Sequence, residues 1–219
     1  MKRACAQAAL KHLTDGMVVG FGGGSTVGLL IEEVAAAGLR IQAASPSGDT
    51  LALCRAAGIP ILPLEMVGHL DVAFDGCDEL DARLNAIKSC GGIHTREKIA
   101  AALAKEYILL ADESKVDEVL RFDYPIPLEV LPAAAGLVQA RLSAMGLRTA
   151  WRRSDTKAGQ TITDDGHYLL DVYYDEAPNP AECQAALSAI PGVVETGLFY
   201  QMASAAIIAG VDGICTLVR

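Results

Sequence analysis

Four carboxylates crowd one short segment of the chain. Asp75, Asp78, Glu79 and Asp81 fall within seven residues, directly after the apolar run 70–74. Ionised carboxylates this close repel one another unless a cation or a ligand compensates. The segment therefore suits acid–base work on a ligand, and its plain alternative is an exposed acidic loop or helix capping by Asp75 or Asp78. A Mg²⁺ site is a third possibility, although the spacing is not that of an EF-hand.

A lysine and a glutamate lie in a second segment, IKSCGGIHTREKI, at residues 87–99. Thr95 is the expected N-cap of a helix over 96–106, with Glu97 in its first turn. An acidic residue there favours the helix dipole, and Lys88 is then an ordinary surface cation. The alternative interpretation makes Glu97 a general base and Lys88 a fixed positive charge that stabilises a developing oxyanion, without a metal.

A glycine-rich loop, GFGGGST at residues 20–26, lies between an expected strand and an expected helix. Glycines and helix N-terminal amides suit an anion such as phosphate. Ser25 and Arg40 replace the last glycine and the acidic residue of a dinucleotide site, and no P-loop lysine follows. A tight turn capped by Ser25 or Thr26 is the alternative. Lys115 adds a cation after another strand, where parallel sheets bind ligands.

Short aliphatic runs alternate with alanine-rich helical stretches up to Tyr124. We expect strands at 17–21, 39–43, 59–62, 70–74 and 107–111, and helices at 2–13, 25–37, 49–57 and 96–106. This alternation predicts an α/β fold with a Rossmann-like parallel sheet and helices on both faces.

The order of elements changes after two prolines near residue 125. The expected elements are a strand at 126–131, a helix at 133–145, strands at 147–153 and 167–174, a helix at 180–189 and a strand at 193–200. That order is typical of a ferredoxin-like α+β unit. Segments 203–211 and 213–218 are expected to rejoin the first sheet. We therefore expect a Rossmann-like catalytic domain of residues 1–124 and 201–219, with an inserted domain of residues 125–200.

The composition limits the partners and the compartment. A net charge of -9 repels a nucleic-acid backbone. The longest charge-free stretch, 17–31, falls short of the roughly 20 residues of a membrane helix, and no signal peptide is recognisable. Six cysteines without a C-x-x-C pair indicate reduced thiols and a cytoplasmic protein. The four histidines lack the spacing of metal ligands.

Taken together and in order, these motifs resemble type A ribose-5-phosphate isomerase. The segments that carry the resemblance are GFGGGST, FDGCDELD, IKSCGGIHTREK, ADESK, YPIPLEVLP, TDDGHYLLD and PGVVETGLF, which span essentially the whole chain. The resemblance implies a homodimer or homotetramer that interconverts D-ribose 5-phosphate and D-ribulose 5-phosphate in the non-oxidative pentose phosphate pathway. It implies no metal and no organic cofactor.

The resemblance also implies residue roles. Glu97 would move a proton between C2 and C1 through an enediolate, and Asp75 would assist ring opening and hydroxyl proton transfer. Asp78 and Lys88 would position the sugar and stabilise the enediolate. The implied substrate-binding residues are Lys2, Gly23, Gly24, Ser25, Thr26, Asp75, Gly76, Cys77, Asp78, Lys88, Ser89, Cys90, Gly91 and Lys115.

Three positions depart from the family pattern. Gly23 stands where a hydroxyl residue is usual, Ser89-Cys90 replaces part of a glycine run, and His94 replaces an apolar residue. With these departures, another aldose phosphate is an alternative substrate. Two further alternatives are a noncatalytic sugar-phosphate-binding regulator and a nucleotide- or CoA-binding enzyme with a similar sheet.

Overall fold

The central element of the fold is a six-stranded sheet. The computed structural model describes residues 1–154 and 158–219. The sheet order is β14-β13-β6-β3-β1-β2, and every neighbouring pair is parallel except β13 with β14. The strands are β1 (Val18–Phe21), β2 (Gln42–Ala44), β3 (Val72–Gly76), β6 (Tyr107–Asp112), β13 (Ala205–Gly210) and β14 (Gly213–Val218). The predicted return of the C-terminal segment to this sheet is confirmed.

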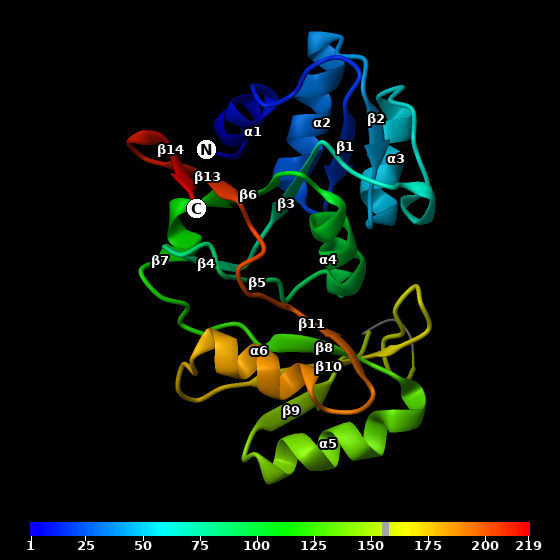
Figure 1. Ribbon diagram of the computed structural model, residues 1–219, viewed down its shortest axis with the longest axis vertical. Coiled ribbons are helices and arrows are strands. Elements are labelled where there is room, and N and C mark those ends of the chain that lie inside the picture. Colours follow the sequence, from blue (N-terminus) through cyan, green and yellow to red (C-terminus); the bar gives the residue numbers. More distant parts are fainter. Residues whose placement is uncertain (155–157) are drawn as a thin grey trace.

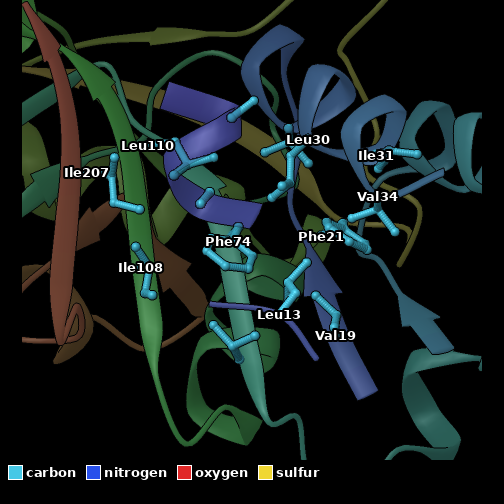
Figure 2. Packing of buried hydrophobic residues seen from close by; sticks show 14 of the residues in the cluster. Leu13, Val19, Phe21, Leu30, Ile31, Val34, Phe74, Ile108, Leu110 and Ile207 are labelled. Atoms are coloured by element: carbon cyan, nitrogen blue, oxygen red, sulfur yellow. The ribbon is translucent and has the colours of Figure 1, made fainter. Parts of the chain in front are cut away.

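Helices cover both faces of this sheet, as predicted (Figure 1). On one face lie α1 (Lys2–Leu10), α2 (Ser25–Ala37) and α3 (Gly48–Ala56), and on the other lies α4 (His94–Leu103). Strand alternation divides the core between the two faces. Figure 2 shows Phe74, Ile108 and Leu110 packed beside helix residues of the first face, whereas Leu109 belongs to the second cluster.

The central sheet and the second unit are linked by a small sheet that the sequence patterns do not predict. Its order is β12-β5-β4-β7, from β12 (Leu198–Phe199), β5 (Ala86–Ile87), β4 (Glu79–Asp81) and β7 (Val116–Asp117). Strands of two or three residues are too short to show an alternation. Three 3₁₀ turns complete the elements near these connections: Leu64–Met66, Glu113–Lys115 and Pro132–Ala134.

Residues 126–154 and 158–196 contain a four-stranded antiparallel sheet and two helices. The order along the chain is β8 (Ile126–Val130), α5 (Ala135–Ala144), β9 (Arg148–Trp151), β10 (Tyr168–Tyr173), α6 (Pro180–Ser188) and β11 (Val193–Thr196). The sheet order β11-β8-β10-β9 with this connectivity is the ferredoxin-like arrangement. Side chains of α5 and α6, among them Val138 and Leu187, share one buried cluster with the sheet.

Two strand predictions are wrong. Segment 59–62 forms only an isolated bridge through Ile61, because Pro60 lacks an N–H and can offer only its carbonyl oxygen to Ala43. Segment 193–200 breaks into β11 and β12 at Gly197, where a Cβ atom would lie 2.4 Å from Pro127 Cδ. The chain therefore changes sheets at this glycine.

The sheet topology supports the expected division of the chain. The chain leaves the six-stranded sheet after β6 and returns to it at β13. We propose that residues 1–124 and 201–219 form one unit and residues 125–200 an inserted one, whose last strand, β12, pairs with β5. In the part of the chain that the structure describes, no helix combines the length and apolarity needed to cross a membrane.

Candidate active site

The four motifs meet at the carboxyl ends of β1, β3 and β6, where parallel sheets place their ligands. A cavity of about 340 Å³ opens there, within the range of ligand pockets. Its lining includes twelve of the expected substrate-binding residues together with Glu97: Lys2, Gly23, Gly24, Ser25, Thr26, Gly76, Cys77, Asp78, Lys88, Cys90, Gly91 and Lys115. Asp75 and Ser89 do not line it.

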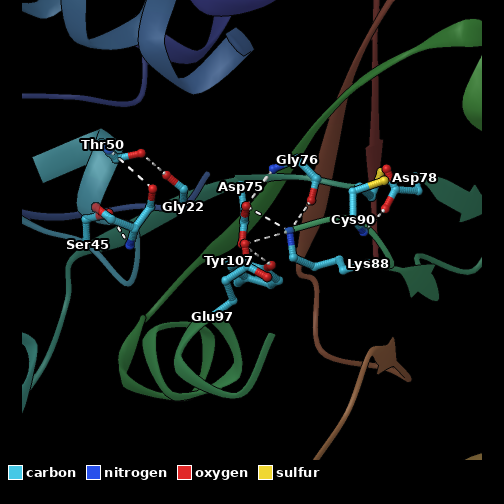
Figure 3. Close-up of polar contacts among 12 residues, drawn as sticks. Gly22, Ser45, Thr50, Asp75, Gly76, Asp78, Lys88, Cys90, Glu97 and Tyr107 are labelled. Atoms are coloured by element: carbon cyan, nitrogen blue, oxygen red, sulfur yellow. Dashed lines mark hydrogen bonds and ion pairs between the residues drawn. The ribbon is translucent and has the colours of Figure 1, made fainter. Parts of the chain in front are cut away.

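A buried ion triad forms the floor of this cavity. Lys88 Nζ lies 2.9 Å from Asp75 Oδ1 and 3.2 Å from Glu97 Oε1, and it donates a hydrogen bond of 2.5 Å to Gly76 O. All three charged side chains are at least nine-tenths buried. Figure 3 shows Lys88 between the two carboxylates, which come from β3 and from the first turn of α4. The plain alternatives, a surface lysine and an exposed acidic loop, are wrong.

Asp75 is held from several directions. The amide of Gly76 donates to its Oδ1 at 2.8 Å, and the Tyr107 hydroxyl donates to its Oδ2 at 3.1 Å. The sequence predicts Tyr107 only as a strand residue, since nothing in it pairs Tyr107 with Asp75. Gly22 lies against the same carboxylate, where a Cβ atom would stand 2.1 Å from Asp75 Oδ1. Thr50 fixes this glycine by donating to Gly22 O at 2.8 Å.

Gly22→Ala should therefore destabilise the protein, whereas Gly23→Ala should not. The new methyl group at 22 must displace a carboxylate that is bound to Lys88, at a cost of about 1–3 kcal/mol in unfolding free energy. At Gly23 the nearest atom, Ile93 Cδ1, lies 3.7 Å from a Cβ position, an ordinary contact distance. Chemical denaturation of both variants checks this, and equal stabilities would contradict the close packing of Gly22 on Asp75.

Opposing interactions set the protonation of the triad. Burial and then the charge of Asp75 raise the pKa of Glu97 to about 8, although Lys88 partly offsets both. Burial opposes the charged form of Lys88, but Asp75 and Glu97 outweigh it, so the pKa of Lys88 is raised. Lys88 therefore stays an ammonium, while Glu97 can exchange a proton near neutral pH.

The remaining acidic residues of the motif have separate tasks. Asp78 lines the cavity, and its Oδ2 accepts hydrogen bonds from the amides of Ser89 at 2.6 Å and Cys90 at 3.1 Å. Glu79 points away and accepts the backbone amides of residues 121, 122 and 124 at 2.8–3.0 Å. Asp81 accepts the amides of residues 83 and 85. The apparent crowding is thus resolved, because Glu79 and Asp81 bind backbone donors away from the triad.

Two further cations and the first amides of a helix also belong to the cavity lining. Lys2 Nζ donates to Ser25 Oγ at 2.8 Å, and Lys115 Nζ donates to Cys77 O at 2.7 Å. The N-cap of α2 is Gly24 at φ 99°, without a side-chain cap, so the alternative of a turn capped by Ser25 or Thr26 is wrong. The first amides of α2 can therefore serve an anion.

Two expectations around α4 need correction. The helix begins at His94 with Ile93 as N-cap, because the Thr95 hydroxyl donates instead to the buried carboxylate of Glu129. His94 does not line the cavity. Its Nε2 lies 3.3 Å from Glu195 O, and burial lowers the pKa of His94 to about 3, so the imidazole is neutral.

Other features of the site bear on reactivity and on metals. Burial raises the pKa of the Cys77 thiol to about 12, so Cys77 is a packing residue and not a nucleophile. Gly92, Ile93, Leu110 and Asp112 line the cavity, although the sequence does not predict them there. Among residues 1–154 and 158–219, no group of three or more His, Cys, Asp or Glu side chains is arranged to hold a metal ion.

The fold and the site together define the class of protein. A buried carboxylate of raised pKa beside an ammonium ion suits proton transfer next to a carbonyl group. The other lysines of the lining and the first amides of α2 suit a phosphate. An α/β enzyme that isomerises a phosphorylated carbonyl compound has this arrangement.

The comparisons with known proteins specify the family. The model of the family ribose 5-phosphate isomerase A (phosphoriboisomerase A) matches residues 42–213. Ribose-5-phosphate isomerase A of Brucella suis biovar 1 is 42% identical over 227 residues, covering 100% of this chain and 97% of that protein. The Thermosynechococcus vestitus protein of the same name is 39% identical over 222 residues, covering 97% and 93%. The chain belongs to the ribose 5-phosphate isomerase A family.

Solved structures agree over the full length. The ribose 5-phosphate isomerase A structure from Methanocaldococcus jannaschii superimposes with a TM-score of 0.92 at 36% identity, covering 100% of this chain and 98% of that one. A D-ribose-5-phosphate isomerase solved in complex with phospho-erythronic acid gives a TM-score of 0.93 at 34% identity, covering 100% and 97%. The predicted fold class, a Rossmann-like parallel sheet with an additional α+β part, is confirmed.

Proposed function

We propose that this chain interconverts D-ribose 5-phosphate and D-ribulose 5-phosphate. The observation that carries the proposal is the ammonium of Lys88 between Asp75 and Glu97 at the floor of a cavity that also holds Lys2 and Lys115. The curated relatives of the family carry the name of this activity. This reaction belongs to the non-oxidative pentose phosphate pathway.

The chemistry follows from the arrangement of the triad. The carboxylate of Glu97 takes the proton from C2 of the open-chain aldose, and an oxyanion develops at O1. Lys88 stabilises this charge, since a buried ammonium needs little reorganisation as the charge forms. Glu97 then returns a proton to C1 while the proton of the C2 hydroxyl passes from O2 to O1, the transfer that Asp75 is proposed to assist, and the enediolate becomes the ketose.

Asp75 and Asp78 are proposed to support these steps differently. Asp78 lines the cavity, so it can bind a sugar hydroxyl directly. Asp75 lies beneath the cavity and binds Lys88 and Tyr107. We propose two roles for Asp75. Its carboxylate fixes the charge and the orientation of the Lys88 ammonium, and during ring opening the Asp75 carboxylate must reach the substrate hydroxyl.

The phosphate is proposed to occupy the end formed by Lys2, Ser25, Thr26 and Lys115. Two ammonium groups and the first amides of α2 face this end. Local cations are needed because the chain as a whole carries a charge of -9. Gly24, Cys77, Cys90 and Gly91 also line the cavity.

A turnover assay distinguishes the candidate functions. Purified protein in EDTA should convert ribose 5-phosphate to ribulose 5-phosphate, with slower turnover of other pentose and hexose phosphates and of unphosphorylated ribose. Binding of ribose 5-phosphate without turnover would instead identify a sugar-phosphate regulator. Faster turnover of another aldose phosphate would reassign the substrate, and loss of activity in EDTA would contradict a metal-free mechanism.

The raised pKa of Glu97 predicts how turnover depends on pH. Only the carboxylate form accepts the C2 proton, so kcat/KM should rise with pH through about 8, the pKa that burial and Asp75 give Glu97 in the free protein. The substrate phosphate, whose second pKa is about 6, is already a dianion in this range. Initial rates at low substrate between pH 6.5 and 9.5 check this. A profile that is flat above pH 6.5 would contradict the raised pKa.

We also propose a homodimer or homotetramer in a reducing cytoplasm. All six cysteines are free thiols, which suits that compartment. The oligomeric state rests on the family resemblance, and light scattering coupled to size exclusion tests it.

A further inference from the structure

The loop of residues 88–93 connects β5 to α4 and holds the site together. Lys88 stands at its start and Glu97 follows it within the first turn of α4. Cys90, Gly91 and Gly92 form part of the cavity wall. The conformation of this loop therefore sets both the wall of the cavity and the separation of the ammonium from the base.

Arg152, directly after β9 in the second unit, contacts this loop from outside the cavity. Its Nη1 donates to Cys90 O at 2.9 Å, and its Nη2 donates to Ser89 O at 2.7 Å. Asp171 on β10 orients the guanidinium, accepting from its Nε at 3.0 Å and from its Nη2. The planar, permanently charged fork of an arginine suits two successive carbonyl oxygens, which a lysine cannot match.

The same two residues are bound from the opposite side. Asp78 accepts the amides of Ser89 and Cys90, while Arg152 donates to their carbonyl oxygens. Hydrogen bonds at both ends of a peptide group strengthen each other. The guanidinium therefore strengthens the Cys90 N–H as a donor to Asp78, and the Gly91 N–H as a donor at the cavity wall.

The packing of the loop on β10 supports this arrangement. Gly92 has φ +70°, and a Cβ atom there would lie 2.6 Å from Leu169 Cδ1. The loop thus lies directly on the second unit. The side chains of Arg152 and Asp171 are 19% and 12% exposed, so their ion pair is largely shielded from solvent.

We propose that Arg152 is a positioning residue for the isomerisation. It does not line the cavity in which the substrate is proposed to bind. It acts through the Ser89 and Cys90 carbonyls, so that Asp78, the Gly91 amide and Lys88 keep their places around the reacting carbons. This role rests on the proposed function. Through Arg152, the inserted unit would help to position the catalytic residues.

Three variants and the wild type test the proposal, with initial rates on ribose 5-phosphate as the readout. Arg152→Met should lower kcat by about 10- to 100-fold, the loss expected when hydrogen bonds to a charged group disappear, with a smaller change in KM. Arg152→Lys should recover only part of that loss. Guanidinium chloride at millimolar concentration should raise the kcat of Arg152→Met towards that of the wild type.

Arg148→Met is the matched control, because Arg148 begins β9, the strand that Arg152 directly follows, and its guanidinium stacks on the Tyr173 ring at 4.1 Å. Arg148→Met should keep wild-type kcat.

A folded Arg152→Met with wild-type kcat would overturn the proposal, as would a loss of kcat that guanidinium does not restore at all. If Arg152→Met fails to fold, Arg152→Lys tests the proposal instead, and a wild-type kcat for Arg152→Lys overturns the proposal. An inactive wild type would refute the proposed function itself, and this proposal with it.

Discussion

Glu97→Gln is expected to lower kcat for ribose 5-phosphate by about 10²–10⁴-fold, the usual contribution of a positioned general base. The amide is close in size to the carboxylate and still offers an oxygen to Lys88, but it cannot take the C2 proton. Substrate affinity should therefore change little. Steady-state rates and isothermal titration calorimetry of the variant measure the two effects separately.

Glu106→Gln is the control for this substitution. Glu106 is an exposed glutamate just beyond the end of α4, so its replacement should leave kcat unchanged. If Glu97→Gln retains wild-type kcat, Glu97 is not the base. If it loses affinity in proportion to kcat, its main task is binding.

The Glu97→Gln variant should also be more stable than the wild type above neutral pH. The folded-state pKa of Glu97 is raised above its ordinary value, because burial and Asp75 disfavour the carboxylate. Wild-type stability should therefore fall as pH rises from about 4.5 to about 8, and the variant, whose amide does not titrate, should lack this loss. Tm measured at pH 5 and pH 8.5 checks this. A difference that does not grow with pH would contradict it.

Lys88→Met is expected to reduce kcat by about 10²–10³-fold, comparable with the loss of one oxyanion-stabilising donor. It also leaves Asp75 and Glu97 together and buried without their shared cation. The pKa of Glu97 should rise further, so the pH profile should move to higher pH. Rate profiles of the variant measure both changes.

Lys115→Met provides the comparison for Lys88→Met. Lys115 lines the cavity at the proposed phosphate end and donates to Cys77 O, whereas Lys88 makes the ion pairs with Asp75 and Glu97. Loss of Lys115 should raise KM and leave the pH profile in place. Lys88→Met with a normal profile would show that the triad is not coupled as the distances indicate.

The sequence predicts most of the fold because the aliphatic runs are buried on both faces. The parallel strands, the covering helices and the order of elements in the second unit follow from those runs. The small sheet that includes β4 and β5 does not, since its strands are two or three residues long. The break at Gly197 depends on contacts with Pro127, which no local pattern shows.

The motifs bring the main site residues together, but the contacts that fix them depend on the folded chain. Asp75 is bound by Tyr107 and approached by Gly22, residues 32 and 53 positions away. Arg152 reaches Ser89 and Cys90 from another sheet. Such pairs connect distant segments, so neither spacing nor residue type reveals them.

The three departures from the family pattern affect the cavity unequally. Ser89 does not line it, whereas Cys90 does, and the backbone atoms of both residues contact Asp78 and Arg152. His94 is buried on the far side of its helix, near Glu195. Gly23 lines the cavity beside Glu97, where a Cβ atom would lie 3.8 Å from Glu97 Oε1. A change in substrate preference would therefore arise at Gly23 or Cys90, the two departures that line the cavity.

Exchange of the C2 proton with solvent tests the central proposal most directly, namely that Glu97 carries this proton through an enediolate. Ribose 5-phosphate incubated with the wild type in D₂O and followed by NMR should acquire deuterium at C2, and the ribulose 5-phosphate should acquire it at C1. Glu97→Gln should show neither at matched protein concentration. Equal exchange and equal turnover in Glu97→Gln and in the wild type would contradict the proposed mechanism.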